Sequence, residues 1–352
     1  MNGSARKGRA LAAVLILAGL ALAALSWLLA PTAFGHGWVA ALFTLLGWPL
    51  GSMALLLIHA LTGGRWGEAI RTPLLLGVLV LPLALLGLIP VAVLLPSLYT
   101  WTNPGVADTL YNSWWLNIPF LGIRVAVELV VWLVLAALTV LGALGRGPAL
   151  ARIAPAGLIL LAITATAASI DLTEALDPTF SSSIYGMLTG TGMTLFALAV
   201  AILLGLPTAS RKSRNDLAKL MLALCILWTY LDFAQFLVIW NSNLASDAPW
   251  LTRRTVGFWA WSLGALWLVH ALGAVLLLGV PGLRSRLPVL GGFAVAVILL
   301  RFVRAWWLVL PGIRMAPGWA DAGCMAGLFA IAAGLLWLLS RLAAFRAEAR
   351  HA

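Results

Sequence analysis

Five charged side chains lie within stretches of sequence that are otherwise apolar enough for a membrane interior: Arg124, Glu128, Asp232, Arg301 and Arg304. A charge near the centre of a bilayer costs at least about 2.5–3.5 kcal/mol. We therefore expect these residues to form ion pairs with one another or to have a function. Two kinds of chemistry need charges at such depth. A buried carboxylate beside an arginine can carry a proton, and polar groups in an apolar pocket can hydrogen-bond the carbonyl oxygens of a quinone.

The spacing of these residues places them on shared helix faces. Arg124 and Glu128 are four residues apart, and Arg301 and Arg304 are three apart, so each pair projects from one side of its helix. At a rise of about 1.5 Å per residue, both pairs and Asp232 fall between the membrane centre and its outer face. The sequence therefore predicts a polar layer in the outer half of the membrane.

We expect further groups to join this layer. Asp171 ends another apolar run at the outer surface and is a possible third acid, while Gln235 and Tyr230 would extend a hydrogen-bond chain from Asp232. Glu128 and Asp232 are the preferred proton carriers, and the three arginines would tune them. For a quinone ring, the packing candidates are Trp228, Trp240 and Phe233.

A purely structural interpretation stays open at this stage. Arg124 with Glu128, and Asp232 with Arg301 or Arg304, would then be buried ion pairs that only fix helix register. The pairing of residues on different helices cannot be read from one chain.

The elements that must position these residues are transmembrane helices. The chain has 352 residues, of which 63% are hydrophobic and 9% are charged, whereas about 25% charged residues are usual in soluble domains. Continuous apolar runs of about 20 residues favour helices over a barrel. We predict one membrane domain over residues 1–352, with ten spans at 10–30, 38–61, 72–95, 117–143, 153–171, 183–206, 217–241, 255–280, 287–311 and 320–341.

The net charge of +11 does not indicate a nucleic-acid-binding protein, because the basic residues stand at the ends of apolar runs. Sixteen Lys and Arg residues fall on one side of the ten spans, against Arg253, Arg254 and Arg314 on the other. Both termini are therefore predicted to face the cytoplasm. The first apolar run is longer than the core of a signal peptide, and we interpret it as an uncleaved helix.

The cysteines and histidines of the sequence do not indicate a metal or haem site. Cys225 and Cys324 both lie in apolar runs, and no CxxC or CxxCH motif occurs. We expect His36 in an outer loop, His59 near the cytoplasmic end of a span and His270 within a span. No two of these share a depth, so we predict neither a bis-histidine haem nor a metal site.

The aromatic segment 97–117 (SLYTWTNPGVADTLYNSWWLN) is predicted to be an outer loop. Tyr and Trp gather at membrane interfaces as anchors, and this interpretation is the simpler one. The length of the segment and its Asn and Pro residues also suit a docking surface for an external partner.

Four segments carry a resemblance to a known family: 59–73 (HALTGGRWGEAIRTP), 114–132 (WWLNIPFLGIRVAVELVVW), 157–187 and 216–259. Their ordered motifs are LTGGRWG, D-P-x-F-S-x-x-I-Y-G and W-x-Y-x-x-F-x-Q-F-x-x-I-W-x-x-N. Together they resemble the F subunit of bacterial alternative complex III, within the polysulfide-reductase (NrfD/PsrC-like) superfamily. The similarity runs from the second span to the ninth.

Matching positions extend the candidate list. Arg124 follows the N-x-P-F run of the family; Asp171, Asp177, Ser181 and Tyr185 match its D…DP…S…YG segment; Tyr230, Gln235, Trp240 and Asn243 match its long motif. Leu172 stands where the family usually has Trp, and Ser246-Asp247 keeps one charge of a usual acidic pair. These departures bear on outer-loop contacts and leave the expected fold unchanged.

The resemblance implies a fold of two four-helix bundles with flanking helices, and a quinol:cytochrome c oxidoreductase complex of the bacterial cytoplasmic membrane. The partners would be an iron–sulfur protein, a multihaem cytochrome c and a paralogous membrane subunit, which is the better-supported quinol site. This subunit would hold no redox centre or covalent cofactor and have no activity alone. It would anchor the redox subunits and contribute a quinone pocket or a proton half-channel. A secondary transporter and a purely structural anchor remain as alternatives.

Overall fold

The computed structural model describes residues 3–242 and 247–340 of the chain. Within these residues it is all-helical without strands, and ten helices are long and apolar enough to cross a membrane. The helical class is thereby confirmed, as is the expectation of ten helices with the length and composition of membrane spans. Asn243 of the family motif and the C-terminal Arg341, Arg346 and Arg350 lie outside the described residues.

The spans follow one another with short connections. In chain order they are α1 (Gly3–Leu29), α2 (Pro31–Thr62), α3 to α5 (Arg65–Val78, Leu81–Leu86, Leu88–Val93), α8 (Ile118–Ala143), α9 (Leu150–Leu172), α10 (Tyr185–Gly205), α11 (Arg211–Ser242), α13 and α14 (Gly257–Trp267, Ala274–Leu278), α16 (Leu287–Val309) and α17 (Trp319–Leu339). Short helices connect them: α6 (Leu95–Leu98), α7 (Pro104–Ala107), α12 (Ala248–Arg254) and α15 (Pro281–Arg284).

The loop expected before residue 38 does not exist. Pro31 begins α2 directly after Ala30, because proline fits the first turn of a helix, where its missing N–H is not needed. His36, predicted in a loop, therefore lies inside α2.

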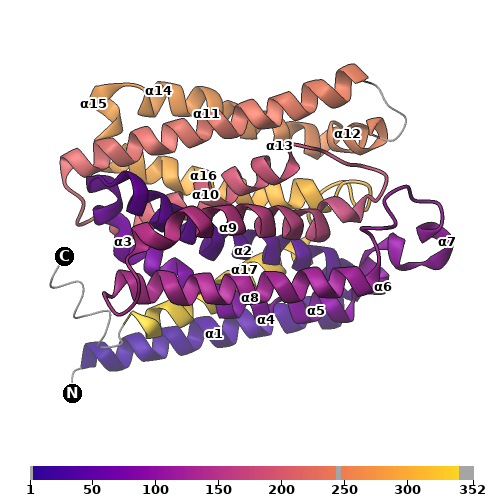
Figure 1. Cartoon of the computed structure of the whole chain (residues 1–352), viewed down its shortest axis with the longest axis horizontal. Helices are drawn as coiled ribbons and strands as arrows, with labels where there is room; N and C mark the ends of the chain where they lie inside the picture. The colour runs from indigo at the N-terminus through magenta and orange to yellow at the C-terminus, as the bar shows by residue number, and fades with distance from the viewer. Residues whose placement is uncertain (1–2, 243–246, 341–352) are drawn as a thin grey trace.

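The spans run side by side, with α7 and α12 at one end of the bundle and α3 and α15 at the other (Figure 1). α2 occupies the centre and packs against α3, α9, α10, α16 and α17. α1 packs along α17 at the edge, so the first and last spans are neighbours. Both candidate sites below use helices that pack on this central pair of α2 and α10.

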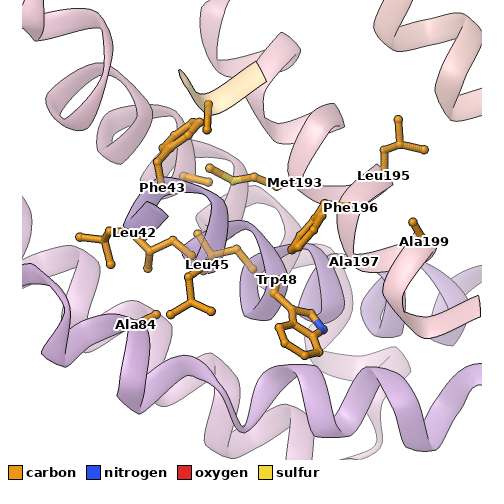
Figure 2. Packing of buried hydrophobic residues seen from close by; sticks show 14 of the residues in the cluster. Leu42, Phe43, Leu45, Trp48, Ala84, Met193, Leu195, Phe196, Ala197 and Ala199 are labelled. Carbon is orange, nitrogen blue, oxygen red and sulfur yellow. The ribbon is translucent and has the colours of Figure 1, made fainter. Parts of the chain in front are cut away.

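Small residues let α2 and α10 approach closely. A Cβ atom added at Gly51 would lie 2.3 Å from the carbonyl oxygen of Met193, so only glycine fits there. Figure 2 shows Phe43 and Trp48 of α2 on the side of Met193 and Phe196 of α10 in the resulting core. Van der Waals contact of this kind is what holds helices together in lipid.

The third span is broken into three helices. Pro82 and Pro90 lack the N–H that a continuous helix needs, and the chain turns between α3, α4 and α5. The first break, at Leu79 and Val80, falls near the middle of the span. The eighth span is likewise interrupted, by a π-helical turn over Leu268–Gly273. Such turns occur often at functional sites.

Candidate functional site

Arg124 of α8 and Asp171 of α9 form a two-pronged ion pair in the buried interior. Arg124 Nε donates to Asp171 Oδ2 at 2.9 Å, and Nη2 donates to Oδ1 at 2.8 Å. The parallel geometry matches the planar guanidinium to the carboxylate and makes the pair strong. The predicted pairing of Arg124 with Glu128 is therefore wrong, because Asp171 on the neighbouring helix takes the guanidinium instead.

The start of α8 sets the position of Arg124. Asn117 caps the helix by accepting a hydrogen bond from the backbone N–H of Phe120 at 2.9 Å. Trp115, just before the cap, accepts from Arg124 Nη1 through its carbonyl and donates its indole N–H to Asp171. The rings of Trp115 and Phe120 lie 4.1 and 4.5 Å from the guanidinium carbon. The arginine is thus fixed on every side.

Glu128 lies one helical turn from Arg124 and receives no such support. Its side chain is buried, and Oε1 has no hydrogen-bond partner. Glu128 lines a cavity of about 260 Å³ with Asp171, Tyr99 and Trp132, and the other lining side chains are apolar. An ionisable group without a partner, in an apolar cavity, is a candidate for binding or chemistry.

The cavity opens on the flank of the bundle. Its lining includes the exposed residues Ala92 of α5, and Ile118 and Gly122 of α8. Around them Ile89, Val93 and Ile123 are also exposed, which gives the opening an apolar rim suited to lipid. A ligand could therefore enter sideways from the bilayer.

The broken third span forms one wall of this cavity. Leu88, Val91 and Ala92 come from α5, and Leu95 and Tyr99 come from α6 and its end. The Tyr99 hydroxyl donates to the carbonyl of Leu172 at 3.0 Å and ties this wall to α9. Burial raises the pKa of Tyr99 well above its usual range, so the hydroxyl remains a donor. Sequence reasoning placed Tyr99 only in an aromatic belt.

The second cluster of charges lies on α11 and α16, and Trp267 of α13 binds to it. Arg304 Nη2 donates to Asp232 Oδ1 at 2.5 Å, and Trp267 donates to Oδ2 at 2.8 Å. The interpretation that Asp232 pairs with Arg304 is confirmed. Arg301 makes no ion pair among the described residues, and its Nη1 has no partner. The five charges thus form two separate groups.

Other predicted residues divide between the interior and the surface. Gln235 accepts from the Ser182 hydroxyl at 3.0 Å, and Tyr185 is buried with its hydroxyl 2.7 Å from that of Thr173. Tyr230 and Trp240 are each 67% exposed on α11. Both point away from the buried groups and are not brought to either cluster.

The three aromatic residues proposed to pack a quinone do not meet. Trp228 is fully buried against His270, with ring centroids 4.7 Å apart, while Trp240 is exposed. Twelve residues of helix separate these two tryptophans, a distance of about 18 Å. Phe233 packs on Trp267 instead.

The aromatic residues of segment 97–117 divide between the interior and the surface. Tyr99 and Trp101 are buried, and Trp115 binds Asp171, so these aromatic residues belong to the interior. Tyr111 and Trp114 are exposed and remain available for an interface. At the same end of the bundle, Asp177 pairs with Arg253, while Ser181 accepts from the Tyr111 hydroxyl.

The cysteines and histidines behave as core and capping residues. Cys225 and Cys324 are free and buried. His59 bonds the carbonyl of Gly64 beyond the end of α2, and His270 Nδ1 donates to the carbonyl of Leu266. The described residues contain no group of three or more His, Cys, Asp or Glu side chains arranged to hold a metal ion.

Comparison with known proteins adds no identification. No protein-family model and no curated protein matches this chain.

Proposed function

We propose that this chain is an integral membrane subunit of a quinol-oxidising respiratory complex in a bacterial cytoplasmic membrane. Its ten spans would form two four-helix bundles flanked by α1 and α17, with both termini in the cytoplasm. It would anchor an iron–sulfur protein and a multihaem cytochrome c at the outer face, beside a paralogous membrane subunit. The motif resemblance and the distribution of basic residues support this proposal.

One observation carries the assignment of the quinol site to this chain. The cavity beside Glu128 opens on the flank of the bundle, is lined mostly by apolar side chains, and holds a buried carboxylate oxygen without a partner. Its volume of about 260 Å³ is close to the lower end of the range for small-molecule pockets, about 300–1,000 Å³. A quinol ring would occupy the cavity while its tail remained in the lipid.

The residues around the cavity then have distinct roles. Glu128 would accept a hydroxyl proton as the quinol is oxidised, because its carboxylate faces the cavity and is not held by an arginine. Arg124 and Asp171 would keep the wall in place through their two-pronged pair. The electrons would pass to the redox subunits, since this chain is expected to carry no redox centre.

Gly122 gives a sharp test. It lines the cavity, and a Cβ atom added there would meet no atom within 4 Å. Gly122→Leu should therefore fill the cavity without disturbing the core. We expect the variant complex to assemble but to lose quinol oxidation and binding of a quinone analogue.

Gly190→Leu is the matched control. Gly190 also has open space around it, but it lines a different cavity of about 350 Å³ between α2, α9 and α10. The control should retain activity. If Gly122→Leu binds the analogue as well as the unaltered chain does, the cavity is not the quinone site; a loss confined to Gly190→Leu would move the site to the other cavity.

A proton path through the second cluster is a second candidate function. A void of about 10 Å³ touches Asp232 and Gln235, and another touches Arg301 and Arg304. Voids of this size fit a single water molecule each. Water on both sides of the Asp232–Arg304 pair would connect the polar groups into a route through the outer half.

The alternatives are separated by copurification and transport. A transporter is expected to have helices broken near the midplane, as the third span is, and it should move solute when reconstituted alone. A respiratory subunit should instead be isolated with c-type cytochromes. A structural anchor would copurify as well, but it would tolerate Gly122→Leu without loss of quinol oxidation.

A further inference from the structure

The side chain of Arg301 is a buried cation that makes no ion pair with any residue that the structure describes. Only 7% of the residue is exposed, and Nη1 has no hydrogen-bond partner. The described charged groups that act on it are Arg304 and Asp232, with the thiol of Cys225 alongside. Asp232 already accepts from Arg304 and Trp267 through its two oxygens. Two arginines therefore share one carboxylate, which leaves an excess of one positive charge.

A small void lies beside these two arginines. It is lined by both arginines and by residues of α2 and α10, and its volume is about 10 Å³. The guanidinium of Arg301 lies directly over Gly192, one of the lining residues: a Cβ atom added at Gly192 would be 2.2 Å from Nη2 and 2.9 Å from Nη1. Arg304 Nη1 is also buried and without a partner. The missing side chain at position 192 makes room for the guanidinium of Arg301 beside the void.

The remaining lining offers nothing that would neutralise the charge. Phe43, Met193 and Phe196 are apolar, and the three lie together between α2 and α10 (Figure 2). Thr44 donates its hydroxyl proton to the carbonyl of Ala40. The lining contains no acidic side chain.

We propose that Arg301 and Arg304 bind one monovalent anion of halide size at this void, which is chloride under ordinary conditions. Because the void holds no more than about one water molecule, the two arginine side chains would move apart to admit the ion. Guanidinium N–H groups are the donors that such an ion needs, and apolar walls exclude competing water. A water molecule would satisfy the hydrogen bonds but not the charge, and an uncompensated charge in a buried site is strongly destabilising. The site is separate from the Glu128 cavity and does not depend on quinol oxidation.

Thermal stability against halide concentration tests the proposal. The full chain would be purified in detergent and unfolded at constant ionic strength, with gluconate replaced stepwise by chloride or bromide. A ligand that binds the folded state raises Tm with the logarithm of its concentration. We expect this rise in the unaltered chain and in Gly190→Ala, where a Cβ atom meets nothing within 4 Å, but not in Gly192→Ala.

Bromide diffraction on the unaltered chain keeps the test independent of how the variant folds. An anomalous peak between Arg301 and Arg304, together with the rise in Tm, would support an anion site. The absence of a peak, or an equal halide response in Gly192→Ala and Gly190→Ala, would overturn it. The void would then hold only water, as the proton path requires.

Discussion

Arg124 on α8 binds Asp171 on α9 through two parallel hydrogen bonds, although an acid lies one turn away on its own helix. A bond between neighbouring helices fixes their relative height as well as neutralising both charges. Glu128 is thereby left facing the cavity without a cation of its own. The ion pair stabilises the site, and the unpaired acid is free for chemistry.

Asp171→Asn should weaken the fold. Removing one partner of a buried pair leaves the other charge uncompensated, and this typically costs about 3–5 kcal/mol. We expect a clear fall in the thermal midpoint of the detergent-solubilised chain. Asp108→Asn, at an exposed position of segment 97–117, is the control and should change little. If the two variants unfold alike, the pair contributes nothing to stability.

Glu128→Gln should separate stability from activity. The side chain keeps its shape, and Oε1 has no partner to lose, so the thermal midpoint should stay nearly constant. Quinol oxidation by the assembled complex should fall by about 100-fold or more, the usual effect of losing a proton acceptor. Glu68→Gln, exposed at the start of α3, serves as the control. Full activity in Glu128→Gln would remove the proposed role of the carboxylate.

Asp232→Asn tests the second cluster by two measurements. Arg304 loses its only acidic partner among the described residues, so the variant should be less stable than the unaltered chain. If a proton path passes here, the number of protons moved per electron should also fall in the assembled complex. An unchanged turnover and an unchanged proton-to-electron ratio would exclude Asp232 from such a path.

Gly51→Ala should disrupt the contact between α2 and α10. The new methyl group would lie 2.3 Å from the Met193 carbonyl oxygen, which is backbone and cannot turn aside. Overpacking of this kind costs about 1–3 kcal/mol and sometimes more. Gly122→Ala, on the open flank of α8, should change stability by no more than about 0.5 kcal/mol. Comparing the two thermal midpoints checks whether α2 and α10 pack this closely.

Sequence alone predicted the ten spans because a membrane requires each crossing helix to be a long apolar run, which one chain displays directly. It also predicted that Arg124, Asp232 and Arg304 would be buried, since their helices offered no other place for them. Asp171 was predicted at the outer surface, and the structure shows that it is buried as well. The predicted depth did not reveal which acid each arginine binds. Which acid an arginine binds depends on how neighbouring helices are rotated about their axes, and this rotation cannot be read from a single sequence.

The Glu128 cavity could not be predicted from the sequence either. The prolines of the third span are plain in the sequence, but their effect is a wall made of short helices opposite Glu128. Tyr99 belongs to that wall only because the chain turns before it. Phe233 and Trp240 have aromatic side chains that could stack on a quinone ring. The structure places them elsewhere, Phe233 against Trp267 and Trp240 on the surface.

The contact between α1 and α17 has a consequence for synthesis. Gly19 and Gly327 meet so closely that a Cβ atom on either would lie less than 3 Å from the carbonyl oxygen of the other. Protein chains are made at about 5–20 residues per second, so the first helix waits roughly 15–60 s in the membrane for the last. During that time its glycine face has no partner. We therefore expect the edge of the bundle nearest α1 to assemble last.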